Sequence, residues 1–188
     1  MRKFVFIISF LFCLCSISEA QNFVVKTNVL YLGTSTPNIG FENKIGKKLT
    51  RELEVGYNPW DLKTEENFKV KHLLVSPELR YWFCEPYLGH FVGLGSNLVY
   101  YNIGALPVDI YGLKDSRIEG HAASLGLNYG YSVPIARKWN FEFNAGLGLW
   151  YTQYDKYESR KCGLFQESIS KYALGLSSLG ASFVYIIK

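Results

Sequence analysis

The chain has 188 residues, of which 48% are hydrophobic, 16% aromatic and 19% charged, and its formal net charge is +4 at pH 7. This length is sufficient for one domain with a sizeable core. The low charge and high aromatic content exclude an intrinsically disordered chain, and the mild positive charge gives no reason to expect a nucleic-acid partner. Because aromatic residues favour strands and glycine marks turns and bulges, the composition predicts an all-β protein.

Residues 1–20 have the pattern of a signal peptide. Two basic residues precede a largely apolar segment, residues 4–14, and Ser18-Glu19-Ala20 is a small-x-small cleavage site before Gln21. The apolar segment is shorter than the roughly 20 residues that a membrane-spanning helix needs. We therefore expect an exported protein whose mature chain covers residues 21–188.

Apolar and polar residues alternate with a period of two along most of the mature chain, which predicts β-strands. The last strand changes phase near Ser177 and Ser178, which predicts a β-bulge. No linker or second domain separates the strands. In chain order they cover residues 25–31, 39–45, 53–59, 73–83, 92–100, 123–135, 139–151 and 172–187.

The connections between these strands differ in length. Residues 33–37, 46–48, 84–89 and 136–138 form short connections, and residues 58–69, 104–117 and 155–170 form long, polar ones. Short turns at one end with longer loops at the other are typical of outer-membrane barrels. We therefore predict an all-β fold, an eight-stranded antiparallel up-and-down transmembrane β-barrel.

Alternation alone does not decide which face points outward, because a soluble ligand-binding barrel has the same period and an apolar interior. Three features favour the membrane form. The polar face is rich in glycine, asparagine and serine, which suits a narrow interior. Aromatic residues, Trp82 and Tyr101 among them, gather at strand ends as two belts. The chain also ends on a strand with Gly180, Phe183 and Tyr185 at a spacing that resembles the signal read by the barrel-assembly machinery.

Segments spread over the mature chain resemble one family of proteins. They are residues 26–31 (KTNVLY), 37–42 (PNIGFE), 58–60 (NPW), 77–85 (PELRYWFCE), 89–93 (GHFVG), 138–142 (KWNFE), 154–158 (YDKYE) and 184–188 (VYIIK). On these segments the chain is similar to an uncharacterised family, a domain of unknown function, of small outer-membrane β-barrels from Bacteroides-type bacteria. The resemblance implies an outer-membrane location and genes often encoded near fimbrial genes. It implies no activity and no catalytic residues.

The chain departs from this family at two places. Members often carry Cys-x-x-Cys in the last loop, where this sequence reads Ser159-Arg160-Lys161-Cys162. Members often have Gly-Pro-Thr-Lys before the last strand, where this sequence reads Gly175-Leu176-Ser177-Ser178. The resemblance therefore does not extend to a disulfide or metal site in the last loop.

Charged residues on the inward-facing side of the predicted barrel are the first candidate site. Charges removed from water must be paired, so we expect an ion-pair network that fills a narrow interior. Gating of a narrow conduit is the alternative. The residues are Lys26, Glu42, Lys44, Glu54, Glu78, Arg80 and Glu142.

Aromatic and charged residues of the long loops are candidates for surface interactions, because binding residues concentrate in loops on rigid scaffolds. They are Trp60, Asp61, Tyr111, Tyr157, Arg160 and Lys161. The expected partners are outer-membrane lipids, the barrel-assembly machinery during biogenesis, and fimbrial or other envelope proteins. No nucleic-acid partner is expected, and a monomer is the default.

The sequence contains no pattern that predicts catalysis. His72 and Ser76 share a strand face, but at about 3.3 Å per residue they lie roughly 13 Å apart. Metal-ligand spacings and nucleotide-binding motifs are absent, so we expect no cofactor and no metal. We therefore predict a non-enzymatic outer-membrane β-barrel that acts in surface interaction or supports envelope and fimbrial assembly through its long loops. The alternatives are a lipid-modifying outer-membrane enzyme and a soluble ligand-binding eight-stranded barrel.

Overall fold

The structure is a computed structural model that describes residues 23–63, 68–104, 116–158 and 163–187, except for the side chains of residues 62 and 63. The predicted signal peptide lies outside these residues. Almost all of the described chain is strand. The elements are β1 (Phe23–Asn28), α2 (Val29–Gly33), β2 (Asn38–Lys44), β3 (Leu49–Asn58), β4 (Asp61–Lys63), β5 (Phe68–Trp82), β6 (Gly89–Gly104), β7 (Ser116–Ala136), β8 (Trp139–Glu158) and β9 (Phe165–Ile187).

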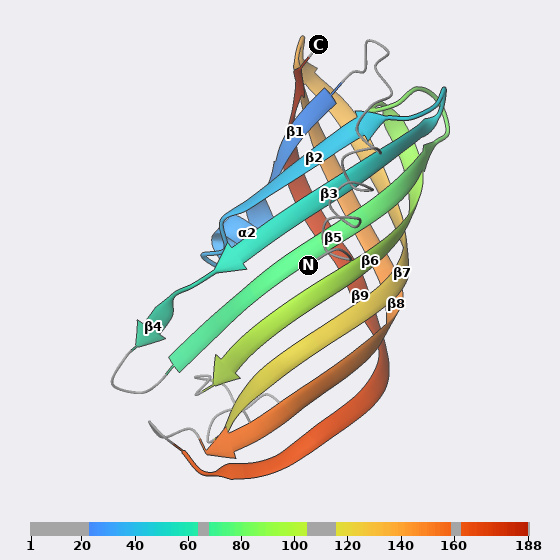
Figure 1. The fold of residues 1–188 in the computed structure, drawn as a ribbon. Helices are drawn as coiled ribbons and strands as arrows, with labels where there is room; N and C mark the ends of the chain where they lie inside the picture. The colour runs from blue at the N-terminus through green and yellow to red at the C-terminus, as the bar shows by residue number, and fades with distance from the viewer. Residues whose placement is uncertain (1–22, 64–67, 105–115, 159–162, 188) are drawn as a thin grey trace, which may run out of the picture.

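Eight of the strands, all except β4, form a ring in which neighbours along the chain pair antiparallel (Figure 1). The ring closes because β9 pairs with β1, from Phe23 opposite Ile187 to Asn28 opposite Ser182. β3 pairs directly with β5, so β4 is a side branch that pairs only with the start of β5. The predicted eight antiparallel, up-and-down strands are confirmed.

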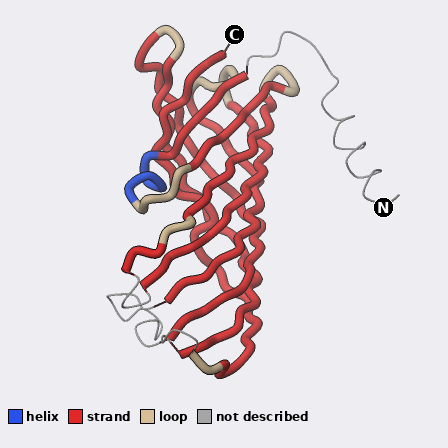
Figure 2. The backbone as a smooth tube through the Cα atoms, turned by 60° about the vertical axis from the view of Figure 1, so that its left-hand side comes forward, coloured by secondary structure: helices blue, strands red, loops and turns tan. Residues whose placement is uncertain are grey.

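The two ends of the ring differ (Figures 1 and 2). The C-terminal end of β9 and the start of β1 lie at the end that carries the short connections 45–48, 83–88 and 137–138. We call this the turn end. β4 and the last residues of β8 lie at the opposite end. The part of the chain that the structure describes contains no helix long and apolar enough to cross a membrane.

Along each strand the apolar side chains point outward and the polar ones inward. In β7, Leu125 and Leu127 are 61% and 71% exposed, whereas Ser124 and Asn128 on either side of this pair are buried. Trp82, expected in an aromatic belt, is instead fully buried inside the ring. It follows Arg80 on the inward-facing side of β5, so its position obeys the alternation of the strand.

Two sequence-based boundaries are corrected by the structure. The strand predicted over residues 25–31 ends at Asn28, where the chain turns into α2. Asn28 ends the strand because its side chain accepts a hydrogen bond from the Leu30 backbone N–H, which caps the helix. The loop predicted over residues 155–170 is partly strand, since β8 runs to Glu158 and β9 begins at Phe165. Most of the loop predicted over residues 104–117 lies outside the described residues.

The predicted bulge in the last strand is confirmed. Gly146 of β8 pairs with Ser178, and the next residue, Leu147, pairs with Leu176. Ser177 is therefore the extra residue of β9, and its side chain is buried inside the ring. An inserted residue of this kind shifts the inward-facing side of the strand from one parity to the other.

Candidate functional site

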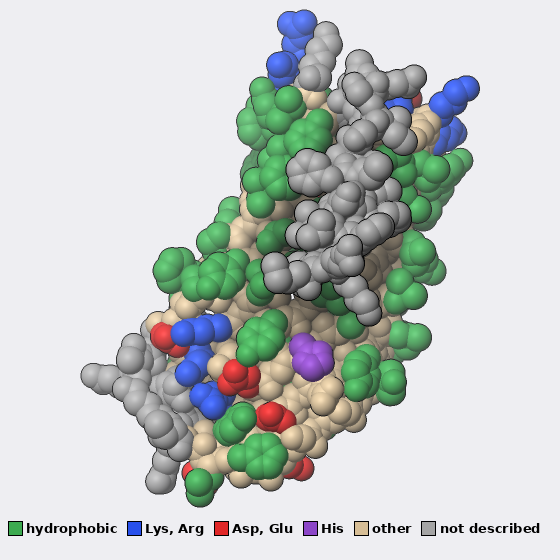
Figure 3. Space-filling model, in the orientation of Figure 1, with side chains coloured by type: hydrophobic (Ala, Val, Ile, Leu, Met, Phe, Trp, Pro, Cys, Tyr) green, Lys and Arg blue, Asp and Glu red, His purple; other side chains and the backbone are tan. Residues whose placement is uncertain are grey.

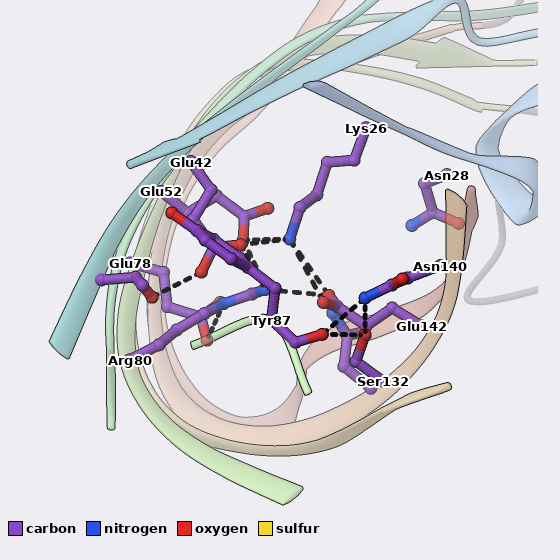
Figure 4. A network of polar contacts seen from close by, with 12 residues as sticks. Lys26, Asn28, Glu42, Glu52, Glu78, Arg80, Tyr87, Ser132, Asn140 and Glu142 are labelled. Atoms are coloured by element: carbon purple, nitrogen blue, oxygen red, sulfur yellow. Dashed lines mark hydrogen bonds and ion pairs between the residues drawn. The ribbon is translucent and has the colours of Figure 1, made fainter. Parts of the chain in front are cut away.

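A buried ion-pair network lies inside the ring toward the turn end (Figure 4). Its first centre is the ammonium group of Lys26 on β1. Lys26 Nζ lies 2.6 Å from a carboxylate oxygen of Glu42, 2.9 Å from one of Glu52 and 3.2 Å from one of Glu142. These carboxylates come from β2, β3 and β8, so one ammonium group links four strands.

The second centre is the guanidinium group of Arg80 on β5. Its nitrogens lie 3.2 Å from Glu42, 2.6 Å from Glu52 and 2.8 Å from Glu142. Its Nε also donates to Glu78 on the same strand, at 3.1 Å. Two cations thus share three carboxylates, and a fourth carboxylate contacts Arg80 alone. The four carboxylates outnumber the two cations in contact with them.

Glycines on the neighbouring strands make room for this network. A side chain at Gly93 would collide with the carboxylate of Glu78, and a Cβ at Gly40 would lie 2.6 Å from Cγ of Lys26. The aliphatic part of Lys26 therefore passes over Gly40. The ammonium group reaches Glu42 and Glu52, which oppose each other in the β2–β3 register.

Aromatic side chains close the network off at the turn end. Trp82, Tyr87 and Phe91 pack together with Val24 and Val184 as a buried cluster. The guanidinium of Arg80 lies 4.4 Å from the centre of the Phe91 ring, an arrangement that favours the cation. Trp82 Nε1 donates to Thr50 at 2.9 Å, and Thr50 donates to Glu42.

Tyr87 belongs to the short turn between β5 and β6 and holds that turn inside the ring. Its backbone has a positive φ of 69°, and its carbonyl oxygen accepts hydrogen bonds from Asn140 at 2.6 Å and Ser132 at 2.9 Å. Burial, and after it the negative charge of Glu42, raises the pKa of the Tyr87 phenol above its ordinary value. The turn therefore acts as a plug across the turn end of the interior.

Neutral polar side chains form the next layer of the interior, away from the turn end. Asn97 donates to Ser124 at 2.7 Å and to the Ser177 carbonyl at 2.8 Å. Asn128 donates to Glu78 at 2.9 Å, which joins this layer to the ion pairs. The remaining cavity between the two layers is only about 20 Å³, roughly the space of one water molecule.

The network contains five of the seven charged residues that the sequence indicated for the interior. Lys44, at the end of β2, is half-buried and forms none of the ion pairs seen among the described residues. Glu54 points inward and lines the small cavity beside Tyr31. Among the described residues, Lys26 forms no ion pair with Glu54, because the Lys26 side chain leans toward the turn end and meets Glu52.

Sequence reasoning missed Glu52, which contacts both cations. The alternation of β3 begins at Leu49, and Glu52 shares its inward-facing side with Thr50 and Glu54. Arg51, an outward-facing charge, interrupts the apolar pattern, so the strand was expected to begin only at residue 53. The pattern that could have placed Glu52 inside is the spacing of outward-facing Leu49 and Leu53 on either side of Arg51, which shows that the strand begins before residue 53.

The loop candidates fall into two groups. Trp60 is half-exposed and donates from Nε1 to the Ser35 carbonyl at 3.0 Å. Asp61 lies in β4 and forms an exposed ion pair with Lys71 at 2.7 Å. Its pKa is lowered, chiefly by the hydrogen bond from Lys71. Tyr157 lies in β8 with the Arg117 guanidinium 4.7 Å from its ring centre. Tyr111, Arg160 and Lys161 lie outside the described residues.

The three histidines make separate contacts. His72 Nε2 is 3.4 Å from the Thr36 hydroxyl, inside the ring. His90 Nδ1 is 2.6 Å from the Tyr129 hydroxyl, on the outer face. His121 lies opposite Tyr100 in the β6–β7 register. Within the described ranges, no group of three or more His, Cys, Asp or Glu side chains is arranged to hold a metal ion.

The geometry of the network suits a structural role. Its charged groups contact one another and their nearest neighbours, and the plug at Tyr87 separates them from the turn end. Removing one member would leave the opposite charge buried without its partner, which is costly. The network therefore ties β1, β2, β3, β5 and β8 together from the inside.

Comparison with known proteins gives one match. The sequence model of a family described as a protein of unknown function, DUF3575, matches residues 5–187. No curated protein and no solved structure matches the chain.

Proposed function

Because the chain belongs to the DUF3575 family, whose description assigns no function, we propose a function from the geometry of the ring. The protein is an eight-stranded transmembrane β-barrel of the bacterial outer membrane. It is not an enzyme. The end opposite the turn end faces the outside of the cell, where it serves surface interaction or supports the assembly of envelope structures such as fimbriae. The fimbrial part follows from the resemblance of the sequence to a family often encoded near fimbrial genes.

One observation carries this proposal, namely the direction of the two faces of the ring. Large apolar side chains are exposed around the outside, including Leu94 on β6, Leu127 on β7 and Leu149 on β8. The inside holds ion pairs, amides and hydroxyls. An exposed apolar surface of this extent marks an interaction with another apolar phase, and the arrangement is the one a membrane barrel requires.

The distribution of charge along the ring supports the same proposal. In the space-filling view, hydrophobic side chains cover the flanks, and Lys, Arg, Asp and Glu side chains lie toward the two ends (Figure 3). The connections at the turn end contain four basic residues, Lys47, Lys48, Arg137 and Lys138. An apolar band with charged ends matches a bilayer with its two headgroup regions.

The packed interior argues against a porin. Side chains fill the ring between the ion pairs and the amide layer, and the Tyr87 turn covers one end. Barrels of eight strands are just wide enough for their own side chains, whereas aqueous channels need about 16 strands. We therefore assign surface interaction rather than transport to this barrel.

The alternative that needs no membrane is a soluble barrel that binds a ligand in its interior. Such a barrel needs an apolar interior and a polar exterior. The ring has the opposite arrangement, and the cavity between its ion pairs and its amide layer is polar and only about 20 Å³. The soluble barrel is therefore the weaker candidate.

Two lysine substitutions on the outer face of β7 test the membrane location. Leu127 lies near the middle of the strand and Ile135 near its turn end, and both are more than half exposed. In a bilayer, Leu127→Lys should cost about 2–4 kcal/mol and Ile135→Lys at most about 1 kcal/mol, because the penalty falls toward the interface. Urea unfolding in phosphatidylcholine vesicles measures both. In a soluble barrel both lysines would be tolerated equally.

Location and orientation are tested in cells. The mature chain should fractionate with the outer membrane, and an epitope tag inserted among residues 105–115 should bind antibody on intact cells. A tag at the connection 137–138 should bind only after the outer membrane is permeabilised. The reverse labelling pattern contradicts the proposed orientation, and recovery of the protein from the soluble fraction contradicts the proposed location.

A further inference from the structure

The ring is not closed by strand pairing over its full height. β1 pairs with β9 only up to Asn28 opposite Ser182, and the chain then turns into α2. Within the described chain, the preceding part of β9, residues 165–181, pairs with β8 alone. The wall between α2 and β9 therefore has no backbone ladder across it. We call this part of the wall the seam.

A groove of about 300 Å³ lies at the seam, a size at the lower end of the range for ligand pockets. Its inner surface is formed by Leu74, Val99 and the indole of Trp150, all on inward-facing strand positions. Its outer rim is formed by Leu176 and Leu179 of β9, which point outward and are 60% and 51% exposed. The groove thus connects the apolar outer face of the ring with an apolar patch inside it.

The backbone of β9 beside the groove is satisfied by side chains instead of by a neighbouring strand. Trp150 Nε1 donates to the Leu176 carbonyl at 3.0 Å, and Asn97 Nδ2 donates to the Ser177 carbonyl at 2.8 Å. Asn28 donates to the Leu179 carbonyl and accepts from the Ala181 N–H, both at 3.3 Å. An unpaired backbone group in an apolar phase costs several kcal/mol, so these contacts make an opening tolerable there.

The same contacts select the chemistry of the occupant. Four of the polar side chains at the groove are already hydrogen bonded: His72 to Thr36, Ser178 to Asn144, Ser177 to Asn128, and Asn97 to Ser124. Among the described residues, no lysine or arginine lines the groove, so these walls offer no cation to an anionic headgroup. At its inner end lies the polar cavity that Glu54 lines, which stops hydrocarbon from going deeper. The apolar side chains of the walls therefore favour hydrocarbon over a charged group.

We propose that the seam groove takes up one acyl chain of a lipid from the surrounding membrane. The chain enters sideways between α2 and β9 and lies against Leu74, Val99 and Trp150, while the headgroup stays outside. This inference rests on the proposed membrane location. An added β-strand is the competing occupant, but it would have to displace the side chains that already satisfy Leu176, Ser177 and Leu179.

Photocrosslinking in vesicles tests the proposal. The mature chain is folded into phosphatidylcholine vesicles that contain a phosphatidylcholine with a diazirine on one acyl chain, and the crosslinked residues are mapped by mass spectrometry. Crosslinks are expected at outward-facing residues such as Leu127 and, in addition, at inward-facing Leu74 and Val99. The buried residue Phe91, inside the ring but away from the groove, is the internal control and should remain unlabelled.

A pair of substitutions on one strand separates the groove from the outer face. Val99→Trp fills the groove from β6, and Val92→Trp adds the same volume on the outward-facing side of β6. Val99→Trp should reduce crosslinking at Leu74 at least fivefold and leave Leu127 unchanged, whereas Val92→Trp should change neither. Each variant is first checked for folding by its heat-dependent mobility on denaturing gels.

The outcomes distinguish this inference from the function on which it rests. Crosslinks on the outer face with none at Leu74 or Val99 would overturn the acyl-chain site and leave the membrane barrel intact. No crosslinks at any residue would overturn the membrane location itself. If the seam instead binds a second copy by strand addition, Leu74 and Val99 stay unlabelled and the folded protein migrates as a dimer on unheated denaturing gels, which also overturns the proposal.

Discussion

The two halves of the ring are held together in different ways. Toward the turn end, every strand pairs with two neighbours, and the space between them is filled by Lys26, Arg80 and their carboxylates. Beyond Asn28, β9 still pairs with β8 but no longer with β1, and single side chains replace the missing ladder. The first half is closed by backbone pairing and buried charge, and the second is left open beside an apolar groove.

This difference shows where the molecule tolerates change. In the turn-end half, charges and aromatic rings contact one another on all sides, so a substitution leaves a buried group without its partner. At the seam, apolar side chains border open space and only a few hydrogen bonds hold the wall. Stability should therefore be concentrated in the half that holds the ion pairs, and ligand exchange in the half that holds the seam.

The largest expected effect is the loss of Arg80. Arg80→Ala removes the cation shared by Glu42, Glu52 and Glu142, and it should destabilise the protein by roughly 3–5 kcal/mol. Urea unfolding in phosphatidylcholine vesicles measures the loss. Arg137→Ala, at an exposed turn-end position, is the matched control and should leave the midpoint unchanged. Equal midpoints for the two variants would show that the buried ion pairs do not hold this half.

A pair of glycine substitutions compares the packing of the two halves. A methyl group at Gly130 would collide with the Phe91 ring and lie 2.7 Å from the Phe143 carbonyl oxygen, whereas one at Gly175 would lie 3.7 Å from Trp150. Gly130→Ala should therefore cost about 1–3 kcal/mol as an overpacked site. Gly175→Ala should cost nearly nothing. Urea unfolding in phosphatidylcholine vesicles measures both costs. Similar costs at Gly130 and Gly175 would show that the two halves of the ring are packed equally tightly.

Removal of the Asn28 side chain weakens the seam itself. Asn28→Ala loses the cap on α2 and the two hydrogen bonds to β9, and about 1–2 kcal/mol of stability should be lost. Hydrogen exchange of the Leu30 and Ala181 amides should accelerate more than that of amides in the turn-end half of β9. Uniform acceleration along β9 would show that the two halves open together.

The smallest effect is expected at the exposed Asp61–Lys71 ion pair. Because Lys71 lowers the pKa of Asp61, the pair contributes to stability at neutral pH and loses that contribution as the pH falls through the lowered pKa. Lys71→Met should return the Asp61 carboxyl titration, followed by NMR, toward its ordinary value. It should change the unfolding free energy by less than about 0.5 kcal/mol, as is usual for exposed pairs. A larger loss of unfolding free energy would show that the end opposite the turn end contributes more to stability than this comparison predicts.

Part of the candidate site could be read from the sequence because a strand places every second residue on the same side. This rule identified Glu42, Glu78, Arg80 and Glu142 as inward-facing. It also places Trp82 inside, next to Arg80 in the same series, although aromatic character alone suggested a membrane belt. Alternation was therefore a better guide than residue type at this position.

The choice between Glu52 and Glu54 could not be made in this way, since both face inward. It depends on the height at which β1, β2 and β3 are aligned and on the direction in which Lys26 leans over Gly40. Neither is encoded in the spacing of β3. The capping of α2 by Asn28 was missed for a related reason, because a short polar residue at a strand end is compatible with either outcome.

The sequence by itself determined most of the strands, which residues share a side of each strand, and the bulge near Ser177, because these follow from local alternation along one chain. Only the tertiary structure decided which charges meet, that Tyr87 plugs the turn end, and that β1 leaves β9 at Asn28. These features depend on ring closure, which brings the first and last strands together and sets their register. Register between distant segments is a property of the assembled ring, and the seam exists because that register pairs only six residues of β1 with β9.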